Sequence, residues 1–257
     1  MVGYIASLFR FGPTVVLFFA SLTVQPLSAE QLRLAVASNF VGVGNVLAAD
    51  FERRTGHRLT ISSGSTGQLY TQILLGAPFD ILLSADELRP SMLVNQGLGK
   101  AESVFTYACG QLVLISSKES QAITDGKTLL IENKYRRLAI ANPETAPFGN
   151  AAKQVLQNLR IWDTVRSKLV QGMNVGQAFH FVATRNAELG LVAASQLEGI
   201  SDFTVWFVPK EMYKPIRQNA VLLKHAGSGP AAQMFIQFLK SEPALERIRS
   251  SGYFVDC

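Results

Sequence analysis

Short apolar runs alternate along the chain with longer segments whose apolar residues recur at helical spacing. The short runs predict strands, and the periodic segments between them predict amphipathic helices, several of which end at a glycine. The predicted strands are residues 32–37, 58–62, 79–86, 111–117, 189–194, 203–209 and 220–225, and one that opens the segment 137–150. The predicted helices are residues 45–56, 68–76, 151–159, 177–186 and 230–241, and one that opens at 84–86. This alternation predicts an α/β protein with mainly parallel sheets and helices on their faces.

The first 29 residues do not fit this alternation. They carry one charge, Arg10, followed by the apolar run Thr14–Val24, then Pro26 and the small residues Ser28 and Ala29. This order is typical of a secretory signal peptide. The apolar run is also shorter than the roughly 20 residues that a membrane-spanning helix needs. We therefore expect cleavage after Ala29 and a periplasmic protein.

Net charge and cysteine number narrow the class of protein. Cleavage would remove one of 24 basic residues and none of 19 acidic ones, which leaves 24 − 1 = 23 against 19 and a net charge of +4. The basic residues form no run longer than a pair, so a nucleic-acid-binding stripe is not expected. Cys109 and Cys257 form an even pair in an oxidising compartment. They fit either a disulfide or one buried and one free thiol.

Four junctions join the end of a predicted strand to the start of a predicted helix. The first backbone N–H groups of a helix are free and lie at the positive end of its dipole, so they bind anions without a charged side chain. In an open α/β sheet, such junctions meet in the crevice at the carboxyl ends of the strands. Pro147 has no N–H, so the N–H of Phe148 is the expected donor of its junction. The junctions are Ser38-Asn39, Ser65-Thr66-Gly67, Ala146–Gly149 and Asn174-Val175-Gly176.

The residues at these junctions are all neutral. Hydroxyl groups and the Asn39 amide are donors, and none of the proposed donors is a carboxylate, which a protonated anion such as hydrogen phosphate would need as an acceptor. The four junctions together therefore favour a tetrahedral dianion of the sulfate or molybdate kind. Taken alone, each junction is better explained as a helix cap, because serine and threonine are preferred there.

The sequence carries no common catalytic motif. It lacks GxSxG, GxxxxGK[ST] and HExxH. A nucleophilic Ser65 would need a base, and no local pairing supplies one. The three histidines are expected to be structural, with His57 exposed, His180 on a helix and His225 at a strand end. We therefore predict a binding protein that is not an enzyme and has no metal ligand or cofactor. A hydrolase that uses Ser65 is the alternative.

Eight segments spread over the chain carry a family resemblance. They are AVASNF, SSGSTGQLYTQI, GAPFDILLSAD, FTYACGQLVL, LAIANPETAPFG, NVGQAFHFV, ELGLVAASQL and KPIRQNAVLL. Together they resemble the periplasmic molybdate-binding proteins of ABC transporters, almost from end to end. The resemblance implies a type II periplasmic-binding fold with mixed, mainly parallel sheets, in which two α/β lobes joined by two crossovers close over a ligand in the cleft between them.

The resemblance also implies a division of the chain. Residues 1–29 are the signal peptide, residues 30–108 and 220–257 form a discontinuous N-terminal lobe, and residues 109–219 form the C-terminal lobe. The crossovers would lie near Tyr107–Gly110 and Ile216–Ala220. This arrangement fits a Cys109–Cys257 bridge between the hinge and the returning C-terminal segment.

A ligand set and partners follow from the same resemblance. The implied oxyanion donors are the hydroxyl and backbone of Ser38, Asn39, the Ser65-Thr66 pair, and the backbone N–H groups of Phe148 and Val175. Which hydroxyl of the Ser65-Thr66 pair is the main donor stays open. One branch of the family has a tyrosine where this chain has Ala193, so Asn39 is expected to replace that donor. The implied function is capture of molybdate, and of tungstate, by a monomer that delivers it to a membrane ABC permease. Sulfate or another tetrahedral oxyanion is the alternative ligand.

Overall fold

The structure is a computed structural model that describes residue 3 and residues 29–117, 123–224 and 229–257. The predicted signal peptide falls outside these residues except at positions 3 and 29, and so does His225. In the described part of the chain, no helix combines the length and the apolar character that a membrane crossing requires.

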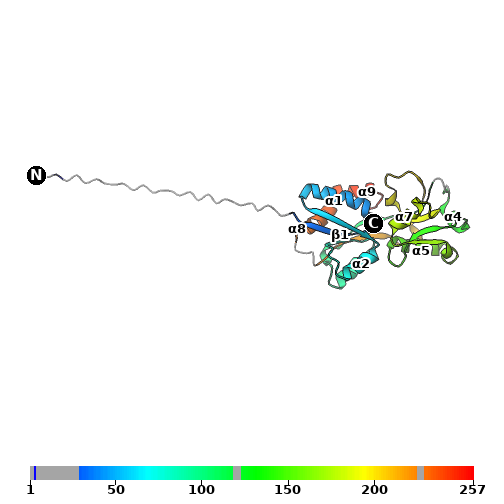
Figure 1. Ribbon diagram of the computed structural model, residues 1–257, viewed down its shortest axis with the longest axis horizontal. Helices are drawn as coiled ribbons and strands as arrows, with labels where there is room; N and C mark the ends of the chain where they lie inside the picture. The colour runs from blue at the N-terminus through cyan, green and yellow to red at the C-terminus, as the bar shows by residue number, and fades with distance from the viewer. Residues whose placement is uncertain (1–2, 4–28, 118–122, 225–228) are drawn as a thin grey trace.

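Two five-stranded sheets, each with helices packed on it, form two lobes that lie side by side (Figure 1). The first sheet has the order β2-β1-β3-β10-β4, and the second has the order β7-β6-β8-β5-β9. The strands of the first lobe are β1 (Gln31–Ala37), β2 (Arg58–Gly64), β3 (Ile81–Leu83), β4 (Phe105–Gly110) and β10 (Ile216–Leu222). The strands of the second lobe are β5 (Leu112–Ser117), β6 (Leu138–Ala141), β7 (Leu169–Gly172), β8 (Leu189–Ala193) and β9 (Phe203–Phe207).

Helices cover both faces of the first sheet. Side chains alternate between the faces of a strand, so Leu34 and Val36 of β1 join one apolar cluster and Ala35 joins another. One face is covered by α1 (Val41–Thr55), α8 (Pro230–Leu239) and α9 (Glu242–Ser250), and the other by α2 (Thr66–Leu74) and α3 (Leu88–Asn95). The second lobe has its own apolar core and carries α4 (Gly126–Glu132), α5 (Pro147–Asn158), α6 (Trp162–Val165) and α7 (Val175–Ala183).

Both sheets are mixed. Two strand pairings in each sheet are parallel and two are antiparallel, and the antiparallel ones all involve β10 or β5. The predicted two-lobed α/β fold is confirmed, but parallel pairing accounts for only half of the described pairings. The reason is that β5 and β10 enter their sheets from the other lobe without a crossover helix, and antiparallel pairing needs none.

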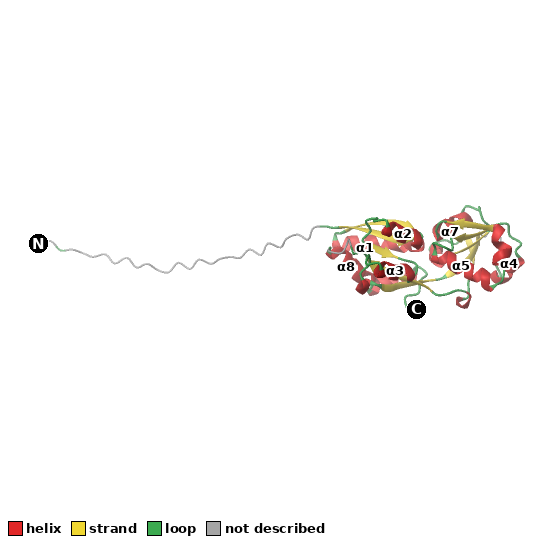
Figure 2. Cartoon of the chain, turned by 90° about the horizontal axis from the view of Figure 1, so that it is seen from below, coloured by secondary structure: helices red, strands yellow, loops and turns green. Residues whose placement is uncertain are grey.

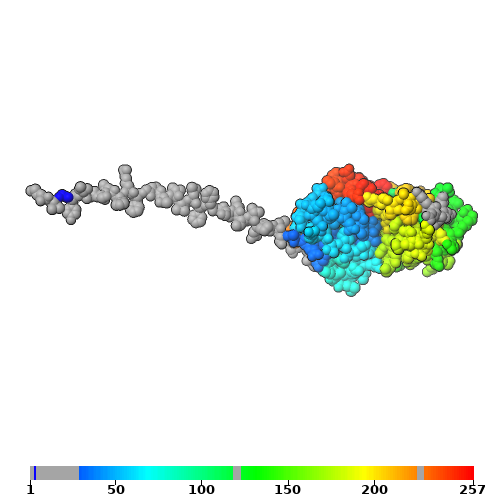
Figure 3. All heavy atoms as spheres, turned by 45° about the horizontal axis from the view of Figure 1, so that its top comes forward, coloured from blue at the N-terminus to red at the C-terminus, as the bar shows by residue number. Residues whose placement is uncertain are grey.

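The chain crosses between the lobes twice. It crosses first at Gln111, between β4 and β5, and again along residues 208–215, between β9 and β10. The predicted limits of the second lobe, residues 109 and 219, lie inside β4 and β10, which pair with each other in the first sheet. The first sheet therefore extends a few residues further at each crossover than the sequence predicts. The first lobe thus contains both ends of the described chain, which Figure 3 shows in blue to cyan and in red in the same half of the molecule.

The C-terminal tail, residues 251–257, lies at the junction of the lobes. The C-terminus is drawn beside this junction in both Figure 1 and Figure 2. Cys257 forms a disulfide with Cys109 of β4, with the two Cα atoms 6.4 Å apart. Phe254 pairs with the same Cys109 in an isolated β-bridge. Two separate links thus attach the tail to the strand that leads into the first crossover.

Candidate anion-binding site

A small cavity lies between the lobes, where strands end and helices begin. Its volume is about 10 Å³, the space of about one water-sized sphere. The six residues predicted as oxyanion donors all line it, and none of the described residues that line it is charged. The lining residues are Ala37, Ser38, Asn39, Gly64, Ser65, Thr66, Ala85, Ala146, Pro147, Phe148 and Val175. The fold therefore brings together all four junctions that the sequence singled out.

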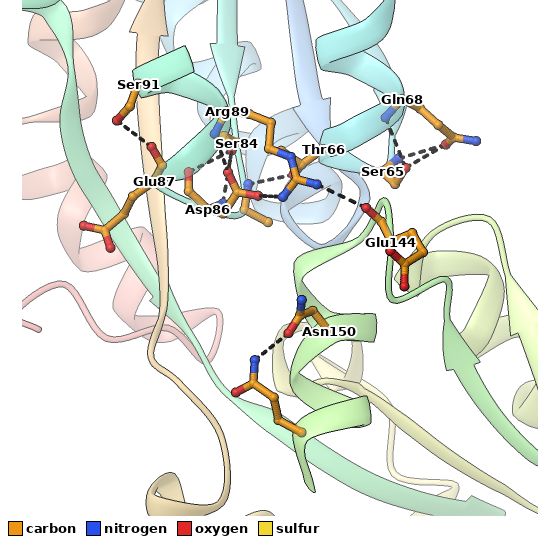
Figure 4. Close-up of polar contacts among 12 residues, drawn as sticks. Ser65, Thr66, Gln68, Ser84, Asp86, Glu87, Arg89, Ser91, Glu144 and Asn150 are labelled. Atoms are coloured by element: carbon orange, nitrogen blue, oxygen red, sulfur yellow. Dashed lines mark hydrogen bonds and ion pairs between the residues drawn. The ribbon is translucent and has the colours of Figure 1, made fainter. Parts of the chain in front are cut away.

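Ser65 acts as the N-cap of α2. Its Oγ accepts a hydrogen bond from the Gln68 N–H at 3.4 Å and donates one to Gln68 Oε1 at 3.0 Å (Figure 4). The Ser65 N–H donates to the same Oε1 at 3.2 Å. This reciprocal pair is a capping box, which satisfies two otherwise free donors at the helix start. The Ser65 hydroxyl proton is therefore already used inside the cap.

The hydroxyls of Thr66 and Ser38 are held differently. Thr66 Oγ1 accepts a hydrogen bond from the Ala85 N–H at 3.0 Å, and Ser38 Oγ accepts one from the Gly176 N–H at 3.4 Å. Neither hydroxyl donates to another described residue. A hydroxyl that is fixed by accepting a backbone bond keeps its own proton for a ligand. Of the Ser65-Thr66 pair, Thr66 is thus the hydroxyl with a free donor in this arrangement.

The second lobe faces the cavity with helix ends. α5 starts at Pro147 without a side-chain cap, so the N–H of buried Phe148 has no intrahelical partner. At the start of α7, the Asn174 side chain accepts from the Gln177 N–H at 3.0 Å. The Val175 N–H, the first of that helix, has no acceptor among the residues that the structure describes. Two backbone donors from this lobe therefore remain for a ligand.

The electrostatic character of the cavity comes from the main chain. The N-termini of α2, α5 and α7 meet there, and each carries a partial charge of about +0.5. Together they supply about +1.5 at a site without charged side chains. The nearby Asp86 carboxylate is paired with Arg89 at 2.6 Å, and neither residue lines the cavity. The site is thus suited to an anion that offers no proton.

Direct hydrogen bonds join the lobes around the cavity. The Gly67 N–H donates to the Thr145 carbonyl at 2.8 Å, and a Cβ on Gly67 would lie only 2.9 Å from that oxygen. Arg89 Nη2 donates to the Glu144 carbonyl at 3.2 Å (Figure 4). Ser195 Oγ donates to the Asn39 carbonyl at 3.1 Å. With contacts on several sides of the cavity, the structure represents a closed arrangement of the lobes.

The Asn39 side chain differs from the prediction. Its amide nitrogen donates to Gln218 Oε1 at 2.9 Å and to the Tyr253 hydroxyl at 3.0 Å. A carboxamide has two N–H donors, so none is left for a ligand. The expected replacement of a tyrosine donor by the Asn39 amide is therefore contradicted. The partners come from segments 179 and 214 residues away, and no local pattern in the sequence points to them.

His57 is buried rather than exposed. Its exposed fraction is 1 %, because its ring stacks on Phe51 and its Nδ1 accepts a hydrogen bond from the Glu30 N–H at 3.1 Å. No histidine and no carboxylate lines the cavity among the described residues. Ser65 therefore has no general base beside it, and the hydrolase alternative loses the group that it requires.

Two lobes around a neutral, helix-terminated cavity define a solute-binding protein of the periplasmic type. Residues 32–254 match the family of bacterial extracellular solute-binding proteins, and the chain belongs to this family.

Relatives and one solved structure agree with this assignment. The chain is 42% identical to the molybdate-binding protein ModA of Rhodobacter capsulatus, over 96% of this chain and 97% of the relative. It is 43% identical to ModA of Azotobacter vinelandii, over 95% of this chain and 98% of the relative. The structure of the periplasmic molybdate-binding protein of Azotobacter vinelandii superposes with a TM-score of 0.83 at 38% identity, over 88% of this chain and all of that chain (100%). These relatives are binding proteins and not enzymes.

Proposed function

We propose that this protein captures molybdate in the cleft between its lobes and delivers it to an ABC permease. The observation that carries the proposal is the cavity, in which hydroxyls of the first lobe and helix N-termini of the second lobe meet without any charged side chain. The relatives of 42% and 43% identity that are named as molybdate-binding proteins support the same ligand.

The donor set fits a fully deprotonated tetrahedral ion. Four donors surround the cavity: the hydroxyls of Ser38 and Thr66 and the N–H groups of Phe148 and Val175. The Asn39 amide that the sequence suggested is not among them, because its nitrogen donates to Gln218 and Tyr253. Among the described residues, no carboxylate lines the cavity, so the hydroxyl of hydrogen phosphate would lack the strong, charged acceptor that it favours.

Size would separate molybdate from sulfate. A tetrahedral oxyanion is larger than the one-water space of the cavity, so the lobes would close on it slightly further apart than in this structure. Donors set for molybdate would leave the smaller sulfate with unmade bonds, each costing about 1.5–3 kcal/mol at a charged group. Two lost bonds correspond to roughly a hundredfold in affinity. Tungstate, which is nearly the size of molybdate, would bind about as well.

Binding and delivery are linked by lobe closure. Donors come from both lobes, so the ion completes its contacts only when the lobes close, and the closed form is the one that a permease would recognise. We propose a monomer exported to the periplasm by a signal peptide cleaved after Ala29. No cofactor is required, because molybdate is the cargo.

Calorimetry on protein purified from the periplasm tests the ligand. Molybdate, tungstate, sulfate and phosphate are titrated in parallel, and N-terminal sequencing of the same sample locates the cleavage site. One-to-one binding of molybdate and tungstate, with sulfate at least about a hundredfold weaker, is the expected outcome. If sulfate binds as tightly as molybdate, the proposal of a molybdate-selective site fails and the sulfate alternative takes its place. Absence of binding by any of the four anions would reduce the junctions to helix caps.

A further inference from the structure

The carbonyl oxygen of Asn39 is the meeting point of three distant parts of the chain. Tyr253, in the C-terminal tail, donates its hydroxyl to this oxygen at 2.7 Å. Ser195, in the second lobe, donates its hydroxyl to the same oxygen at 3.1 Å. A carbonyl oxygen has two lone pairs, so both are used. Asn39 directly follows Ser38 in the cavity wall, and whatever fixes this carbonyl also fixes the turn that presents Ser38.

Tyr253 binds Asn39 in both directions. Its hydroxyl donates to the Asn39 carbonyl and accepts from the Asn39 amide at 3.0 Å. The other amide N–H goes to Gln218 Oε1, which also accepts from the Tyr107 hydroxyl at 3.2 Å. Tyr253 and Tyr107 are buried, and burial raises the pKa of each phenol above its ordinary value. Both hydroxyls therefore stay protonated, so Tyr107 can donate to Gln218 and Tyr253 can donate to the Asn39 carbonyl while it accepts from the Asn39 amide.

The tail that carries Tyr253 is itself anchored. The Cys109 N–H donates to the Phe254 carbonyl at 2.6 Å, the Phe254 N–H donates back to the Cys109 carbonyl at 3.1 Å, and Cys257 is disulfide-bonded to Cys109. The Tyr253 ring also packs edge-on against Phe40, with ring centroids 5.4 Å apart. These contacts lie within the first lobe, so they do not depend on whether the lobes are closed.

The hydrogen bond of Ser195, in contrast, depends on whether the lobes are closed. Ser195 lies on a 3-10 helix, Ala194–Leu197, that follows β8 of the second lobe. Its bond to Asn39 spans the interface and breaks when the lobes separate. Neither Ser195 nor Tyr253 lines the cavity, so neither touches a ligand there.

We propose that Tyr253 and Ser195 are positioning residues for anion binding that act through the Asn39 carbonyl. Tyr253 holds the Ser38-Asn39 turn in its binding geometry in both open and closed forms. Ser195 bonds to the prepared carbonyl only after closure and so lengthens the lifetime of the closed complex. The inference rests on the proposed function, because it assigns roles in binding the same anion.

Variant kinetics test the two roles. Tyr253→Phe is expected to weaken molybdate binding about tenfold. The Asn39 carbonyl would lose the hydroxyl that donates to it, and one N–H of the Asn39 side-chain amide would lose its acceptor. Ser195→Ala is expected to speed dissociation about threefold to tenfold with an unchanged association rate, and Ser195→Thr, which keeps the hydroxyl, is expected to restore the slow rate. Tyr135→Phe is the matched control, because the Tyr135 hydroxyl is buried in the second lobe and has no hydrogen-bond partner among the described residues.

Hydrogen exchange of the ligand-free protein separates this inference from the proposed function. Tyr253→Phe is expected to speed amide exchange at residues 38–41, whereas Tyr135→Phe is not. If the wild type binds no molybdate, the proposed function fails, and the exchange result still decides whether Tyr253 holds the turn. If Tyr253→Phe has the same amide exchange and the same molybdate affinity as the Tyr135→Phe control, the role of Tyr253 is overturned. If Ser195→Ala leaves the dissociation rate unchanged, the role of Ser195 is overturned. Ser195 is half-buried and should tolerate alanine, so this part of the test stands even if Tyr253→Phe fails to fold.

Discussion

The two walls of the cavity offer donors of different kinds. The first lobe presents the side-chain hydroxyls of Ser38 and Thr66, each oriented by a backbone N–H from elsewhere. The second lobe presents the backbone N–H groups of Phe148 and Val175, oriented by the helices that they begin. Hydroxyl donors depend on residue identity, whereas backbone donors depend only on where a helix starts. The first wall is therefore sensitive to conservative substitutions, and the second is sensitive mainly to proline.

Replacement of Thr66 by valine is expected to have the largest effect on affinity. It removes a hydroxyl donor without changing the side-chain shape and leaves the buried Ala85 N–H unpaired. The loss of a bond to a charged ligand, about 1.5–3 kcal/mol, corresponds to roughly tenfold to a hundredfold weaker molybdate binding, toward the upper end here. Calorimetry measures it, with Thr66→Ser as the control that keeps the donor. If the Thr66→Val protein binds molybdate as tightly as the wild type, the Thr66 hydroxyl does not contact the anion.

Replacement of Val175 by proline breaks the second wall without disturbing the helix. Proline is well tolerated at the first helical position, and the extended backbone of Asn174 (φ −149°, ψ 173°) suits a residue before proline. The substitution removes one N–H donor and replaces the buried valine side chain, and loss of the donor should weaken binding about tenfold beyond the effect of Val175→Ala. Val175→Ala, which keeps the N–H, should bind nearly as well as the wild type. Equal affinities for the two variants would show that this backbone donor does not contact the anion.

Ser65→Ala is expected to affect stability more than binding. The Ser65 hydroxyl serves the α2 cap, and loss of such a cap costs about 0.5–2 kcal/mol of unfolding free energy. Molybdate affinity should change less than about threefold, because Thr66 retains its free donor. Denaturant unfolding and calorimetry on the same protein give both values. A Ser65→Ala variant with a larger affinity loss than Thr66→Val would reverse the assignment of the two hydroxyls.

Changes in pH should leave both walls unaltered from about pH 7 to 9, because no lining residue titrates. The residues beneath the first wall respond at higher pH. Burial raises the pKa of Tyr107 and Tyr253 in the folded protein, so above about pH 10 the unfolded chain loses these protons first. The unfolded state then binds fewer protons, and the unfolding free energy falls by up to about 1.4 kcal/mol per pH unit for each tyrosine. Chemical unfolding at pH 9 and pH 11 measures this loss, which should shrink in Tyr253→Phe. An equal loss in both proteins would contradict it.

Local pattern was sufficient for the second wall. Pro147 marks the start of α5 and Asn174 caps α7, so the free donors at Phe148 and Val175 follow from sequence rules for helix starts. Similar rules locate Ser65 and Thr66 at the start of α2. They do not say which hydroxyl is free, since that depends on Gln68 Oε1 in one case and on the Ala85 N–H in the other.

Long-range pairing was beyond the sequence. Asn39 has the residue type and position of a ligand donor, yet its amide is used by Gln218 and Tyr253. His57 follows a helix-ending glycine, where exposure is the usual outcome, yet it is buried against Phe51 and Glu30. A side chain with several possible partners takes those that the fold places nearest, and for Asn39 these come from a strand and a tail far along the chain.

The sequence by itself determined the alternation of strands and helices, the neutral helix-start junctions and hence the chemistry of an anion cradle, because capping and periodicity are local. Only the tertiary structure decided that β5 and β10 run antiparallel, that the Thr66 hydroxyl is the free donor, and that Asn39 joins the tail to the second lobe. Those outcomes depend on which segments meet across the sheet and across the cleft. Such contacts are selected by the packing of the whole molecule rather than by neighbours in the chain.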